Sequence, residues 1–60
     1  MFEDIPSVER KLAKDLYQLA YEYRSHCEGP NDTRIMLMKK GLSEESATKL
    51  VSIANSELYI

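Results

Sequence analysis

The feature that most constrains this chain is its lack of cross-links in a polypeptide of only 60 residues. A chain of about this length buries only about 60% of the surface that its unfolded form exposes, so its core alone gives marginal stability. Small domains therefore commonly depend on disulfides, a bound metal or a partner subunit. The single cysteine, Cys27, excludes an internal disulfide, and the single histidine, His26, leaves no metal-binding spacing. We expect no metal and no cofactor, and we expect self-association or another protein to supply the missing stability.

Composition indicates a cytoplasmic globular protein. The net charge is −2 and 30% of the residues are charged, with both signs present, whereas nucleic-acid-binding proteins commonly carry a basic excess. The longest apolar run, residues 35–38, is far shorter than a membrane span. The acidic pair Glu3 and Asp4 does not resemble the start of a secretory signal, and a lone cysteine fits a reducing compartment. We expect no membrane contact, and we consider nucleic acid a weaker candidate partner than protein.

A long amphipathic helix is predicted over residues 7–28, where apolar residues recur at spacings of three and four. Gly29 followed by Pro30 is expected to end it, with Gly29 in the left-handed conformation. At 1.5 Å per residue the helix would be about 33 Å long, too long for one short helix to cover. Its apolar stripe, our candidate core or oligomer surface, comprises Val8, Leu12, Leu16, Leu19 and Tyr23, with Ala13, Ala20 and Cys27 beside it.

Two shorter helices are predicted over residues 32–40 and 43–58. The first is apolar on all sides at its centre, so it should be buried on several sides. Gly41 is expected to end it, and Ser43 is a favourable N-cap for the second. The apolar stripe of that last helix comprises Ala47, Leu50, Val51, Ala54 and Leu58, with Ile53 on its flank.

These segments predict an all-α fold, a compact three-helix bundle of a long, a short and a medium helix within one domain over residues 1–60. The first helix overhangs what the other two can cover, so we expect dimerisation to complete the bundle. The apolar C-terminal residues Leu58, Tyr59 and Ile60 fit either the core or a segment that binds a partner, and the sequence does not separate these two roles.

A second set of residues on the first helix lies away from the apolar stripe. Tyrosine and arginine are enriched at the energetic centres of protein interfaces. The same side chains can stack bases and neutralise phosphates, or they can simply lie flat over their neighbours. The candidate partner-binding surface comprises Arg10, Lys14, Tyr17, Tyr21 and Arg24.

An alternative interpretation is a helix-turn-helix motif over residues 33–52. The predicted helix lengths fit such a motif, whose turn often contains a glycine. In this alternative Thr48, Lys49 and Ser52 would face the bases. Against it, the would-be recognition helix begins with Glu44 and Glu45, which repel phosphates.

We recognise no catalytic arrangement and expect no enzyme. Cys27 lies near the negative end of a predicted helix and beside Glu28, and both features disfavour the thiolate that a nucleophile needs. We also expect so short a chain to lack a pocket of about 300 Å³. The sequence therefore favours a small non-enzymatic intracellular regulator or adaptor that binds proteins as a homo-oligomer. A helix-turn-helix transcriptional regulator is the alternative.

Overall fold

The fold is all-α, as predicted, with helices in the order long, short and medium. A computed structural model describes residues 2–26 and 28–58. These residues form a short 3-10 helix η1 (Phe2–Asp4) and the α-helices α1 (Ser7–Ser25), α2 (Pro30–Lys39) and α3 (Glu44–Leu58). The part of the chain that the structure describes contains no strand.

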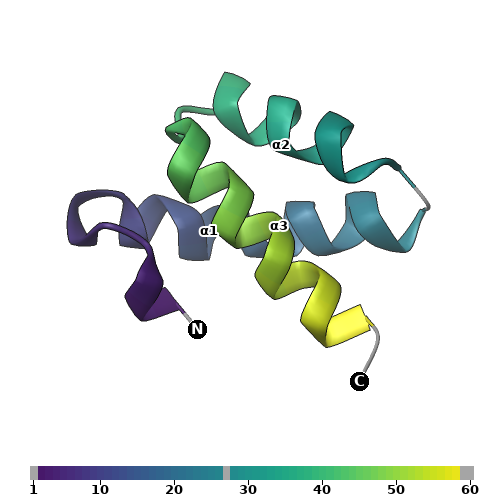
Figure 1. The fold of residues 1–60 in the computed structure, drawn as a ribbon, viewed down its shortest axis with the longest axis horizontal. Helices are drawn as coiled ribbons and strands as arrows, with labels where there is room; N and C mark the ends of the chain where they lie inside the picture. The colour runs from purple at the N-terminus through teal and green to yellow at the C-terminus, as the bar shows by residue number, and fades with distance from the viewer. Residues whose placement is uncertain (1, 27, 59–60) are drawn as a thin grey trace.

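The helices α1 and α2 form an antiparallel hairpin, and α3 crosses one side of it diagonally (Figure 1). The helix α3 packs against both α1 and α2, and η1 packs against α1 and α3. The core lies where these elements meet, and its buried apolar residues are Ile5, Ala13, Ala20, Leu37, Leu42, Ala47, Leu50, Val51, Ile53 and Ala54. The predicted stripe of α3 is confirmed from Ala47 to Ala54, whereas Leu58 is half-buried.

The connection between α1 and α2 differs from the prediction. The helix α1 ends at Ser25 rather than Glu28, and α2 begins with Pro30 as its first residue rather than at residue 32. Gly29 precedes it with an extended backbone, φ −64° and ψ 152°, so the prediction of a left-handed Gly29 is wrong. Because α1 ends at Ser25, Gly29 is the N-cap of α2 rather than the residue that follows α1, and the proline after it favours an extended backbone. Proline in turn is favoured at the first helical position.

Gly41 ends α2, as predicted, and it alone of the two glycines has a positive φ, of 118°. A Cβ atom at this position would lie 3.3 Å from Cδ2 of Leu12. The turn therefore lies close against α1. Ser43 is confirmed as the cap of α3, because its hydroxyl accepts the backbone N–H of Ser46 at 3.3 Å.

A contact between distant parts of the chain completes this cap. The Glu9 carboxylate accepts the Ser43 backbone N–H at 2.7 Å and the Ser43 hydroxyl at 2.9 Å. These hydrogen bonds hold the pKa of Glu9 below its usual value. In a capping box the carboxylate comes from the third helical residue. That residue is Ser46 here, so Glu9 of α1 supplies the missing carboxylate and fixes the start of α3 on α1.

The buried line of α1 lies about a quarter turn away from the predicted stripe. Ala13 and Ala20 are fully buried, because their small side chains allow α3 to approach closely. Leu12 and Leu16 only pack against the edge of the core, and Val8 is 89% exposed. Of the two roles predicted for the stripe, Val8 is therefore not core in the single chain, and its role as an oligomer surface stays a prediction. Leu19 and Tyr23 are half-buried. Cys27 of the predicted stripe and the C-terminal Tyr59 and Ile60 lie outside the described residues.

The helix α2 is buried on one side only, through Thr33 and Leu37. Met36 packs against the core, but Ile35 and Met38 are 43% and 37% exposed. The expectation that α2 is buried on several sides is thus wrong for this chain by itself. The apolar residues of α2 exceed what α1 and α3 can cover.

Candidate protein-binding surface

The two tyrosines predicted as an outward surface lie on the flank of the core. Tyr17 packs against the Phe2 ring at a centroid distance of 5.9 Å and an interplanar angle of 73°, and Tyr21 lies 6.3 Å from Tyr17. Burial raises the pKa of Tyr17, and the negative charge of Glu57 adds to this effect. These contacts place Tyr17 among the residues that hold η1 against α1.

The basic side chains of Arg10 and Lys14 also face η1. The Arg10 guanidinium donates to the Phe2 carbonyl through Nε and to the Ile5 carbonyl through Nη2, both at 3.1 Å. The Lys14 Nζ atom lies 5.9 Å from the centroid of the Phe2 ring. These contacts pin the N-terminal segment, whose Ile5 is fully buried. No periodic signal in the sequence had indicated that Ile5 belongs to the core.

The last member of the set, Arg24, joins three parts of the chain. Its Nε atom donates to Oδ1 of Asn55 on α3 at 2.6 Å, and Nη1 donates to the Glu28 carbonyl. The structure therefore places the five predicted residues along the flank of α1 that contacts η1 and α3. The expectation of a free outward face is wrong, because four of these side chains make contacts that hold other parts of the fold. Partner binding by this set stays a prediction.

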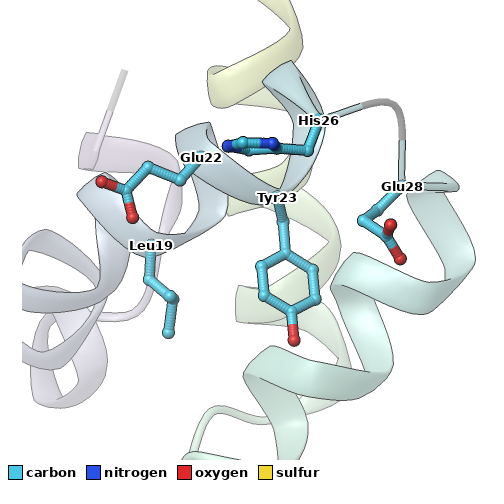
Figure 2. Close-up of a pocket in the computed structure, with 5 residues that line it drawn as sticks. All are labelled: Leu19, Glu22, Tyr23, His26 and Glu28. Carbon is cyan, nitrogen blue, oxygen red and sulfur yellow. The ribbon is translucent and has the colours of Figure 1, made fainter.

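An open pocket lies at the C-terminal end of α1. Its volume is about 410 Å³, and its lining residues are Leu19, Glu22, Tyr23, His26 and Glu28. Figure 2 shows Leu19 and Tyr23 extending in the same direction from α1, with Glu28 contributed by the loop beyond them. The expectation that no pocket of about 300 Å³ forms in this chain is therefore wrong. Sequence periodicity identified the two apolar residues of this pocket but not its acidic and imidazole groups.

The pocket combines apolar walls with exposed carboxylates. Leu19 and Tyr23 are half-buried, whereas Glu22 and Glu28 are exposed. Gln18 donates to the Glu22 carboxylate at 3.4 Å, which leaves further acceptor positions on that carboxylate. No group of three histidine, cysteine, aspartate or glutamate side chains within residues 2–26 and 28–58 is arranged to hold a metal ion. The pocket is chemically suited to an apolar side chain that lies next to a cationic one.

The residues of the DNA-binding alternative lie on the solvent-facing side of α3. Thr48 and Ser52 are exposed. The Lys49 ammonium donates to the Asp4 carbonyl at 2.6 Å and forms an ion pair with Glu45 at 3.0 Å. The only base of this set is therefore engaged within the chain.

The comparisons with known proteins add no family to this description. No protein-family model, curated protein or solved structure matches the chain. Over the described residues, no helix combines the length and the apolar character needed to cross a membrane.

Proposed function

We propose that this chain is a small non-enzymatic intracellular regulator or adaptor that binds proteins through the side of the α1–α2 hairpin that α3 leaves open. The observation that carries the proposal is the pocket at Leu19 and Tyr23, with the exposed acids Glu22 and Glu28 around it. Protein interfaces commonly combine a buried aromatic or aliphatic centre with a polar rim. The partner should therefore present an apolar side chain beside a lysine or arginine.

An exposed apolar residue elsewhere on the hairpin supports the same proposal. Val8 is 89% exposed on α1, the helix that also provides Leu19 and Tyr23. Fully burying a valine side chain contributes about 1.5–3 kcal/mol. A partner that covers Val8 together with the pocket thus gains free energy without any rearrangement of the core.

A peptide titration followed by NMR tests the proposal. We expect a synthetic amphipathic helix of leucine and lysine to shift the amide resonances of Leu19, Glu22 and Tyr23. The same peptide with glutamate in place of lysine should bind more weakly, because the rim is acidic. Glu22→Lys should weaken binding, whereas the matched variant Glu57→Lys, an exposed acid on α3, should not. Equal responses to both peptides, or no response to either, would contradict the proposal.

A gel shift with duplex DNA at low and moderate salt tests the alternative function. Glu44 and Glu45 lie in the first turn of α3, where they repel phosphates, and Lys49 is already paired. We therefore expect no retardation of the DNA even at low salt. Retardation that Lys49→Ala abolishes would favour the helix-turn-helix alternative over a protein-binding module.

A further inference from the structure

The exposed acidic and basic side chains of the α1–α2 hairpin are concentrated at opposite ends of it. Because α1 and α2 run antiparallel (Figure 1), the end of α1 and the start of α2 lie together at the connecting loop. That end carries acids, and the opposite end carries bases. The exposed acids at the first end are Glu22, Glu28 and Asp32, and the exposed bases at the second end are Lys11, Lys39 and Lys40. Lys14 and Asp15, which are also exposed, lie along α1 between the two groups.

The exposed apolar groups on α1 follow the same division. Val8 lies at the basic end and is 89% exposed, whereas Leu19 lines the pocket at the acidic end. These two residues are eleven positions apart, which is about three helical turns, so they lie on the same side of α1 about 16 Å apart. The hairpin therefore carries an exposed apolar side chain near lysines and, about three helical turns along α1, an apolar pocket near acids.

A two-fold axis brings these complementary features together. An isologous interface repeats each contact twice, because residue i of one copy meets residue j of the other and the reverse. With the axis near the middle of α1, Val8 of each copy meets the Leu19–Tyr23 pocket of the other. The same arrangement places Lys11 of each copy opposite Glu22 of the other.

We infer that the partner of this surface is a second copy of the same chain, docked with its α1 antiparallel to the first about a two-fold axis. This inference rests on the proposed function and names the partner of the same site. The chain itself provides an apolar side chain beside a lysine, which is the combination that the pocket accepts. The second copy also covers apolar surface that α2 and α3 leave open on α1.

Sedimentation velocity of the full chain over a concentration series tests the inference. We expect a monomer–dimer equilibrium that weakens with added salt, because exposed ion pairs are screened. Val8→Asp should abolish the dimer and leave helicity unchanged, since Val8 contributes almost nothing to the core. Ser56→Asp, an equally charged change at an exposed position of α3, should leave the dimer intact. A Val8→Asp variant that still dimerises as the wild type does would overturn the inference.

A charge exchange tests the register. Lys11→Glu and Glu22→Lys should each weaken the dimer several-fold, because each places like charges opposite one another, and the double variant should restore it. A double variant as weak as the two single changes combined would overturn this register. A wild type that stays monomeric but binds the leucine–lysine peptide overturns the inference and leaves the proposed function standing. A monomer that binds no peptide overturns both.

Discussion

Replacing Ser43 by alanine removes the side-chain cap of α3 together with one of its bonds to α1. The lost hydroxyl accepts the Ser46 N–H at 3.3 Å and donates to Glu9 at 2.9 Å. Losing an N-cap costs about 0.5–2 kcal/mol. Because Glu9 keeps its bond to the Ser43 backbone N–H at 2.7 Å, we expect a loss near the middle of that range, about 1 kcal/mol. For a domain of this size such a loss lowers the melting temperature by about 4–8 °C.

Thermal and urea unfolding followed by circular dichroism measures this loss, with variants compared at equal concentration because dimerisation would shift the melting temperature. The matched control is Ser56→Ala, at an exposed position of the same helix. It should be neutral or slightly stabilising, since alanine is the better helix former. Equal unfolding curves for the wild type and Ser43→Ala would refute the reasoning. So would equal losses in the two variants.

The same contact predicts an acid dependence with a definite sign. Hydrogen bonds from the Ser43 N–H and hydroxyl lower the pKa of Glu9 from 4.5 in the folded chain. A lowered folded-state pKa adds stability that is present above the unfolded value and is lost as the pH falls through the folded value. We therefore expect the wild type to lose more stability than Glu9→Gln when the pH falls below 4.5. Identical acid dependence in the two proteins would contradict this assignment.

Two further predictions concern the turn and the core. Gly41→Ala should destabilise the chain by about 1–2 kcal/mol, because Gly41 has a φ of 118° and its added Cβ would meet Leu12 at 3.3 Å. The same change at Gly29, where the nearest atom lies 3.6 Å away, should be nearly neutral in urea unfolding, and equal losses would contradict the turn. Leu37→Ala should cost about 2–5 kcal/mol, since Leu37 is fully buried. Ile35→Ala, at a 43% exposed neighbour, should cost far less, and similar melting temperatures would contradict the burial of α2.

Local signals in the sequence were sufficient to predict the all-α class and the number and order of the α-helices. Gly41 and Ser43 ended one helix and began the next as predicted, because turn and cap preferences depend on a few adjacent residues. The periodicity of α3 also identified its buried side, since α3 packs against both other helices. Such signals predict helix ends reliably where the conformational preference of a single residue is strong and tertiary contacts do not oppose it.

The predictions that were wrong concern features that depend on contacts between distant parts of the chain. The predicted stripe of α1 included Val8 as a core or oligomer residue, whereas the fully buried residues of α1 are the small Ala13 and Ala20 beside that stripe. Glu9 and Ser43 lie 34 positions apart, and no local pattern predicts their contact. The pocket was not predicted: Leu19 and Tyr23 were identified only as members of the apolar stripe, and the acids Glu22 and Glu28 have no periodic signal.

The central claim is that the open side of the α1–α2 hairpin is a binding surface that a second copy completes. Sedimentation velocity of the wild type beside Val8→Asp tests it most directly, because that change alters a residue that is 89% exposed in the single chain. The account predicts a concentration-dependent dimer for the wild type and a monomer with the same helical spectrum for the variant. A wild type that is monomeric at every concentration, or a variant that dimerises equally well, would contradict it.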